Sequence, residues 1–114
     1  MDDTLRTLES LLRRNGYGGQ ADALGRVRTA REMGDRQAFE REVTGLSIWG
    51  GSGSVADADV RSVSPQSPAE AKADVPQFYR GMIALAEAVE REGLGTPRIR
   101  EVASVFRSWL ARGV

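Results

Sequence analysis

Residues 46–59 read LSIWGGSGSVADAD, the one stretch of the chain where glycines, an aromatic residue, hydroxyls and acids crowd together. Its three closely spaced glycines permit backbone angles that other residues avoid, so they predict a tight, specifically shaped turn. These glycines are Gly50, Gly51 and Gly53. Ile48 and Trp49 come directly before them and are apolar enough to anchor the turn to a core. The apolar residues on both sides of this stretch recur at helical spacing, so the stretch itself is predicted to interrupt the helices.

The residues after the glycines are compatible with two local structures. Ser54 followed three positions later by Asp57 resembles a capping box, which predicts a short helix from Val55. The alternation of Val55, Asp57, Asp59 and Val60 also permits a short extended segment. Whether residues 55–62 are helix or strand stays open at this point.

Three helices are predicted before this stretch. Asp2, Asp3 and Thr4 offer side-chain oxygens to a helix N-terminus, and Asn15-Gly16 is typical of a helix end. The helices are expected from Asp2 to Asn15, from about Gln20 to Met33, and from the turn at Gly34-Asp35 onward. Their apolar faces, spaced three or four apart, comprise Leu5, Leu8, Leu11 and Leu12; Ala23, Leu24, Val27, Ala30 and Met33; and Phe39, Val43 and Leu46. Gly25 inside the second helix suggests a close helix contact.

Two more helices are predicted after it. Residues 61–68 read RSVSPQSP, and their prolines and serines predict a loop. The long helix that follows begins either at Ser67-Pro68 or at Asp74, with Pro76 then in its first turn. Its apolar stripe is Val75, Phe78, Tyr79, Met82, Leu85, Ala86 and Val89. After Gly93 and Gly95, a last helix opens at Thr96-Pro97, with a buried stripe at Ile99, Val102, Ala103, Phe106, Trp109 and Leu110.

These elements predict an all-α protein. Residues 1–114 are expected to form a single domain, a bundle of about five helices with a glycine-rich loop in the middle. Helices this short are marginal alone in water, so they must pack against one another. Short connections predict antiparallel neighbours.

Composition limits the possible functions. The chain has 16 basic and 16 acidic side chains, and this balance argues against a nucleic-acid partner, which requires a basic surplus. It contains no cysteine and no histidine, which excludes disulfides, Cys/His zinc sites and Cys–His or Ser–His nucleophilic pairs. No apolar run is long enough for a signal peptide or a membrane helix, so we expect a cytoplasmic protein without a membrane partner.

Closely spaced glycines are also found in two nucleotide-binding motifs. Gly51, Gly53 and Ala56 fit the degenerate dinucleotide fingerprint, and Glu70 follows at a suitable distance. That fingerprint requires a parallel sheet, and no second buried strand is evident. A phosphate-binding P-loop requires a Lys-Ser or Lys-Thr pair after the glycines, which is missing here. We therefore interpret the glycines as a structural turn and expect no cofactor and no metal.

The order of these features is similar to a known family. Leucine-rich helices precede a helix that opens at Gly34-Asp35, and the glycine-rich stretch leads through a polar loop to a long helix. Residues 50–57, GGSGSVAD, resemble the Gly-Gly-x-Gly-Ser-x-x-Asp signature of small, largely uncharacterised bacterial helical proteins. The usual form of the signature has Met at the position of Ser52 and Asn at that of Ala56. The resemblance extends over residues 1–92.

Some members of that family look like immunity proteins of bacterial toxin systems. The resemblance therefore implies a protein without chemistry of its own, which binds a cognate toxin and blocks it. A mildly acidic middle of the chain is compatible with a basic toxin surface. The candidate partner contacts are Trp49, Ser52, Asp57, Asp59, Arg61, Glu87 and Glu90. Each also has a structural interpretation, as a core aromatic residue, a cap or a solvated charge.

Two other classes of function remain as alternatives. Asp57, Asp59 and Glu70 are close enough in sequence to suggest a small enzyme or a metal- or ligand-binding protein that uses carboxylates. Their spacing matches no calcium loop. The last helix carries four arginines, Arg98, Arg100, Arg107 and Arg112, which suggest DNA binding. They scatter around the helix, however, and its apolar stripe needs a core.

Overall fold

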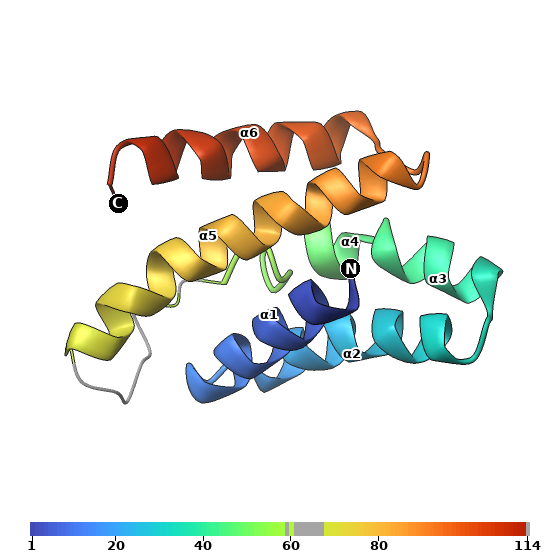
Figure 1. The fold of residues 1–114 in the computed structure, drawn as a ribbon, viewed down its shortest axis with the longest axis horizontal. Coiled ribbons are helices and arrows are strands. Elements are labelled where there is room, and N and C mark those ends of the chain that lie inside the picture. Colours follow the sequence, from blue (N-terminus) through green and yellow to red (C-terminus); the bar gives the residue numbers. More distant parts are fainter. Residues whose placement is uncertain (59, 61–67, 114) are drawn as a thin grey trace.

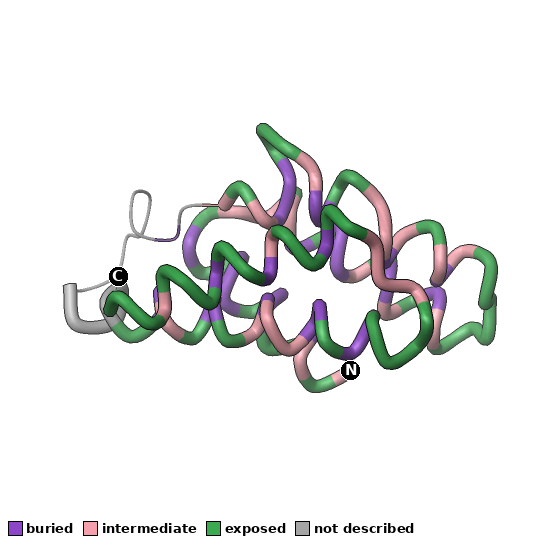
Figure 2. The backbone as a smooth tube through the Cα atoms, turned by 90° about the horizontal axis from the view of Figure 1, so that it is seen from above, coloured by how far each residue is buried: buried purple, intermediate pink, exposed green. Residues whose placement is uncertain are grey.

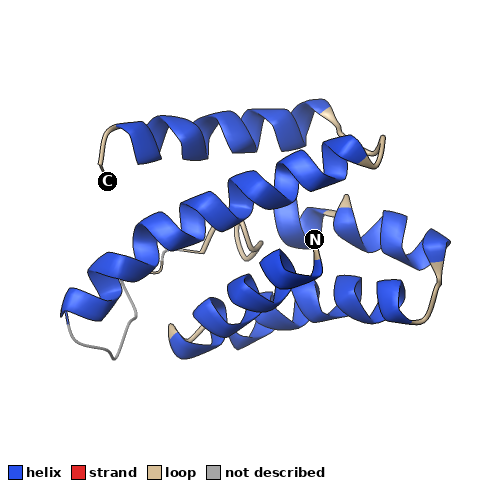
Figure 3. Cartoon of the chain, in the orientation of Figure 1, coloured by secondary structure: helices blue, strands red, loops and turns tan. Residues whose placement is uncertain are grey.

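The computed structural model describes residues 1–58, 60 and 68–113, with the backbone alone for 68–72. Over this part of the chain it contains six helices and no strand (Figure 3). The helices are α1 (Asp2–Arg14), α2 (Gly18–Glu32), α3 (Arg36–Val43), α4 (Leu46–Trp49), α5 (Pro68–Arg91) and α6 (Pro97–Ala111). Helix α4 is a single turn and the other five are longer, so the predicted all-α bundle of about five helices is confirmed.

The helices form two antiparallel pairs (Figure 1). The chain runs along α1 and returns along α2, and it later runs along α5 and returns along α6. Helix α5 lies between the pairs, because it contacts α6 on one side and α1 on the other. The short helices α3 and α4 continue from the end of α2, and α4 also touches α6. The antiparallel arrangement expected from the short connections is therefore present.

Local chemistry explains where several helices begin. Asp35 precedes α3, and its carboxylate accepts a hydrogen bond from the backbone N–H of Ala38 at 3.0 Å. Thr96 precedes α6, and its hydroxyl accepts from the N–H of Ile99 at 3.2 Å, with Pro97 as the first helical residue. Both are side-chain caps of N–H groups that the helix itself cannot satisfy. Both starts were predicted from the sequence.

The sequence left two possible starts for the long helix α5, and the structure shows which one is used. It begins at Pro68, and Pro76 lies inside it rather than in its first turn. Asp74 therefore does not cap this helix. Its buried carboxylate instead binds the neighbouring end of α1, accepting from Arg14 at 2.6 and 3.1 Å and from the amide of Asn15 at 2.9 Å. The Arg14 hydrogen bonds, helped by Asn15, hold the pKa of Asp74 below its ordinary value.

The core contains most of the predicted apolar stripes, seen as the purple segments that face the interior (Figure 2). Its largest fully buried side chains are Trp49, Phe39, Phe78, Leu5, Leu8, Leu11, Leu12, Leu24, Ile48, Met82, Leu85 and Ile99. Gly81 brings α5 close to α1, since a Cβ there would lie 2.6 Å from Leu8 Cδ2. Gly25 of α2 likewise faces α1, where a Cβ would lie 3.3 Å from Glu9 Oε1. The close contact predicted at Gly25 is therefore confirmed.

Two residues assigned to the core are exposed. Met33 is 77% exposed because α2 ends at Glu32 and Met33 lies beyond its last turn. Leu46 is 69% exposed because α3 ends at Val43, and Leu46 starts α4 instead of continuing that helical face. Thr44 helps to end α3, since its hydroxyl donates to the carbonyl of Glu40 at 2.7 Å. Both errors arise from the position of a helix end.

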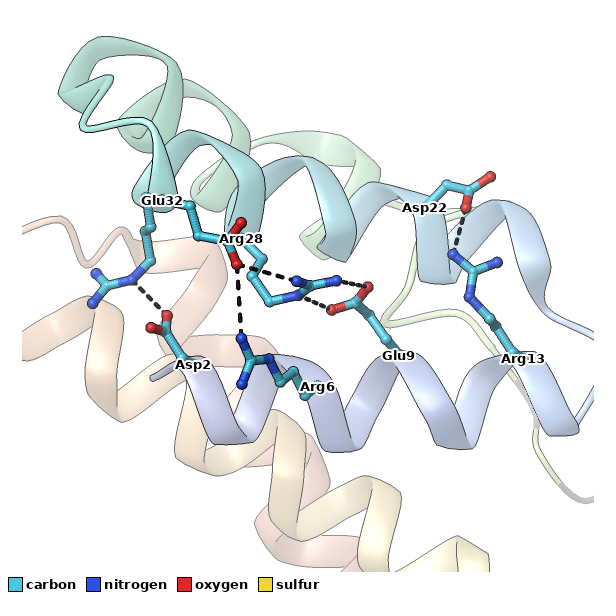
Figure 4. Close-up of polar contacts among 8 residues, drawn as sticks. Asp2, Arg6, Glu9, Arg13, Asp22, Arg28 and Glu32 are labelled. Atoms are coloured by element: carbon cyan, nitrogen blue, oxygen red, sulfur yellow. Dashed lines mark hydrogen bonds and ion pairs between the residues drawn. The ribbon is translucent and has the colours of Figure 1, made fainter.

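Charged side chains line the contact between α1 and α2 (Figure 4). At its centre, Arg28 donates two hydrogen bonds to the buried carboxylate of Glu9, at 2.7 and 3.1 Å. Those bonds raise the pKa of Arg28 above its ordinary value. Three further pairs flank it: Arg31–Asp2 at 2.9 Å, Arg13–Asp22 at 2.7 Å and Arg6–Glu32 at 3.8 Å. We call these eight residues the α1–α2 seam.

Among the described helices, none combines the length and apolar character needed to cross a membrane.

Candidate protein-binding groove

An open groove of about 440 Å³ lies between the glycine-rich segment and α6. From the glycine-rich segment it is lined by Trp49, Gly50, Ala56 and Asp57. From α6 it is lined by Arg98, Glu101, Val102, Val105, Phe106 and Trp109. We call it the α6 groove. It joins the stretch that interrupts the helices to the last helix of the bundle.

The glycine-rich segment folds back on α4 and forms one wall of the groove. The N–H groups of Val55 and Ala56 donate to the carbonyls of Ser47 and Ile48 at 3.0 and 2.8 Å. The hydroxyl of Ser54 donates to the carbonyl of Gly50 at 2.7 Å and thereby closes the turn. Backbone bonds on both sides of the glycines therefore hold this wall in place.

Two of the glycines are required by the shape of this turn. A Cβ on Gly50 would lie 2.5 Å from the carbonyl oxygen of Leu46, which is far inside contact distance. Gly53 has a φ of +87°, in the left-handed region that glycine enters without strain. The interpretation of these glycines as a structural turn agrees with both observations.

Residues 55–58 form tight turns, neither a helix nor a strand. The Ser54 hydroxyl accepts from the N–H of Asp57 at 3.2 Å, which is the first half of the predicted capping box. The Asp57 carboxylate reaches back to the N–H of Gly53 at 3.2 Å. One of the two hydrogen bonds of a capping box is therefore present, while the N–H of Ser54 donates to the carbonyl of Gly51 instead.

Trp49 is a core residue. Its side chain is 1% exposed, and its indole N–H donates to the carbonyl of Val43 at 2.7 Å. The buried ring offers little surface to another molecule, and a partner contact of Trp49 stays a prediction. Its carbonyl accepts from Arg98 at 3.4 Å, which joins the glycine-rich segment to α6.

The opposite wall of the groove carries exposed apolar side chains. Val105 is 41% exposed and Trp109 is 37% exposed. Trp109 packs against Tyr79 and Phe106, with ring centroids 5.6 Å apart in each case. The sequence pattern predicted that Trp109 belongs to the buried stripe of α6, but its contacts with Tyr79 and Phe106 leave more than a third of the side chain exposed.

The predicted contact residues do not form one site. Asp57 lines the groove, while Ser52 is exposed on the turn without lining it. Glu87 and Glu90 lie on α5 and pair with α6, Glu87 with Arg107 at 3.6 Å and Glu90 with Arg100 at 2.6 Å. The Arg100 hydrogen bonds lower the pKa of Glu90 below its ordinary value. These two acids therefore join helices to each other instead of standing free.

Other predicted residues lie outside the described part of the chain. Asp59 and Arg61 are not described, nor is the side chain of Glu70. The carboxylate site of Asp57, Asp59 and Glu70 therefore stays a prediction. Among the side chains that the structure describes, no three acids gather in a way that would hold a metal ion.

Val105 and Glu101 were missed by the sequence reasoning. Both lie on the same face of α6 as Trp109, at spacings of four, which is a signal that the sequence contains. That signal indicates a shared face but not whether another helix covers it. The decisive information is tertiary, because the described helices that pack on α6 are α5 and, over a smaller area, α4.

No family model, curated protein or solved structure matches this chain.

Proposed function

We infer that this protein binds a partner protein through the α6 groove and inhibits it, as an immunity protein inhibits its cognate toxin. The observation that carries this inference is the exposed pair Val105 and Trp109 in a groove walled by a backbone-anchored turn. Exposed aromatic residues supported by a rigid scaffold are typical of the few side chains that dominate protein interfaces. The toxin as partner rests on the family resemblance of residues 50–57.

The chemistry of the groove favours binding over catalysis. Among the described residues that line it, the carboxylates are Asp57 and Glu101, and Asp57 already accepts a hydrogen bond from Gly53 within its own turn. General acid–base work requires a carboxylate aimed at a substrate in an enclosed site. A wide groove with an aromatic wall is better suited to accept a side chain of another protein.

The experiment is co-expression with the product of the adjacent gene, followed by co-purification and an assay of that product's toxicity. We expect a stable complex and loss of toxicity. Trp109→Ala and Val105→Ala should each weaken the complex by at least about tenfold, as expected for interface anchors. Met33→Ala is the matched control, because Met33 is an exposed apolar residue that does not line the groove.

Two outcomes contradict the proposal. One is that no complex forms and the neighbouring product stays toxic with this protein in excess. The other is that Met33→Ala weakens the complex as much as Trp109→Ala, which would move the interface away from the α6 groove.

A further inference from the structure

The charges of the α6 groove are unbalanced. Among the described residues that line it, Asp57 and Glu101 contribute two carboxylates, and Arg98 contributes one guanidinium. Arg98 is directed at the carbonyl of Trp49, at 3.4 Å. Glu101 is exposed and forms no ion pair with any described residue. The groove therefore presents negative charge that the rest of the described chain does not neutralise.

Acidic side chains elsewhere in the bundle do have ion-pair partners. Glu87 and Glu90 of α5 each have an arginine partner on α6 within 3.6 Å. Glu9 and Asp74 at the other helix contacts are also paired with arginines. Two arginines of α6, Arg100 and Arg107, thus pair with acids of α5, while Glu101 on the groove side of α6 has no ion-pair partner among the described residues.

The apolar part of the groove is held in place before any partner arrives. The Trp109 ring packs against both Tyr79 and Phe106, and Tyr79 and Phe106 pack against each other at 5.3 Å. An immobilised ring loses little conformational entropy on binding, so its contact area contributes more fully to affinity. Glu101, Val105 and Trp109 follow at intervals of one helical turn, so acid and apolar surface lie in one line along α6.

We propose that the α6 groove accepts a segment of the partner protein in which an apolar side chain lies beside a lysine or arginine. The apolar side chain packs on Val105 and Trp109, and the basic side chain meets the carboxylates of Glu101 and Asp57. This inference rests on the proposed function and specifies the partner surface for it. The same carboxylates disfavour a nucleic-acid occupant, since its phosphates carry like charge.

The test is selection from a display library of random twelve-residue peptides on the immobilised full-length protein. Counter-selection on the Trp109→Ala variant removes peptides that bind elsewhere. We expect the enriched peptides to combine an aromatic or large aliphatic residue with a neighbouring lysine or arginine. Enrichment of acidic peptides, of purely apolar peptides, or of none at all overturns the proposal.

The affinity of synthetic copies of the selected peptides then shows how much the Glu101 carboxylate contributes to binding. Glu101→Gln should weaken their binding about fivefold, the order expected for a single exposed ion pair. Raised salt should weaken wild-type binding by a similar factor and leave the Glu101→Gln variant nearly unchanged. Asp3→Asn is the control, because Asp3 is an exposed acid on α1, away from the groove. Equal losses for Glu101→Gln and Asp3→Asn contradict the proposal.

The two proposals fail in different ways. If Trp109→Ala abolishes inhibition of the neighbouring product but the selected peptides carry no basic residue, the function stands and the proposed partner chemistry is wrong. If basic, apolar peptides are selected but Trp109→Ala still inhibits the neighbouring product fully, the groove has another occupant and the proposed function is wrong.

Discussion

The α1–α2 seam and the α6 groove are two helix surfaces that differ in how their charged side chains are paired. In the seam, four acids meet four arginines, and the central pair of Glu9 and Arg28 is largely shielded from water. In the groove, as far as the chain is described, two acids and one arginine form the lining, and Val105 and Trp109 remain exposed. The seam is satisfied within the fold. The groove is left with unmet charge and apolar surface, which is the pattern expected where another molecule binds.

The largest difference is expected between two aromatic neighbours on α6. Phe106 is buried, so Phe106→Ala should lower the free energy of unfolding by roughly 3–5 kcal/mol through loss of burial and a residual cavity. Trp109 is more than a third exposed, so Trp109→Ala should cost less, roughly 2 kcal/mol, from the apolar area that it still buries. Urea unfolding of both variants measures this. Equal costs would show that Trp109 belongs to the core and would remove the main reason for placing a binding surface there.

The second prediction compares a seam acid with a groove acid. Glu9→Gln should cost about 2 kcal/mol, because it removes two charge-assisted hydrogen bonds from a buried carboxylate and leaves Arg28 with a neutral partner. Glu101→Gln should change the free energy of unfolding by less than about 0.5 kcal/mol. A large loss with Glu101→Gln would mean that this acid stabilises the fold and is not available to a partner.

The pH dependence of the free energy of unfolding tests whether the buried Asp74 carboxylate is charged in the folded protein. Its folded-state pKa lies below the ordinary value of 3.8, so its charge stabilises the fold at every pH above that value. The stabilisation is lost as the pH falls from 3.8 through the folded-state pKa. Asp74→Asn should therefore cost about 2 kcal/mol at neutral pH, and the difference from wild type should shrink in strong acid. A difference that does not change with pH would contradict a charged Asp74.

The smallest effect is expected at the edge of the seam. Arg13 and Asp22 lie 2.7 Å apart, but both side chains are more than half exposed. Asp22→Asn should cost no more than about 0.5 kcal/mol, and that cost should disappear at high salt. Thermal unfolding at low and high ionic strength measures both. A cost as large as that of Glu9→Gln would show that the seam acts as one cooperative network.

Most of the fold follows from local patterns in the sequence. Helical spacing and the caps at Asp35 and Thr96 place the helices correctly, because these signals act within one turn of chain. Met33 and Leu46 were misplaced because helix ends depend on hydrogen bonds a few residues away. The close approach of Gly81 to Leu8 was not predicted, since it joins helices that are far apart in sequence.

The candidate site was predicted less well than the fold. The glycine-rich stretch was rightly identified as a feature that shapes one surface, and Asp57 lies in the resulting groove. Trp49 was expected to contact a partner, but its ring is buried, and Trp109 was expected in the core, but it is partly exposed. Periodicity places both rings on apolar faces, but only the packing of α4, α5 and α6 shows which face is covered.

The contrast between the two tryptophans has a practical consequence. The indole of Trp49 is enclosed and hydrogen-bonded, while that of Trp109 is open to solvent. Their fluorescence therefore separates into a component shielded from dissolved quenchers and a component that quenchers reach. The protein thus carries a natural reporter of unfolding and a natural reporter of groove occupancy in the same chain, without any attached dye.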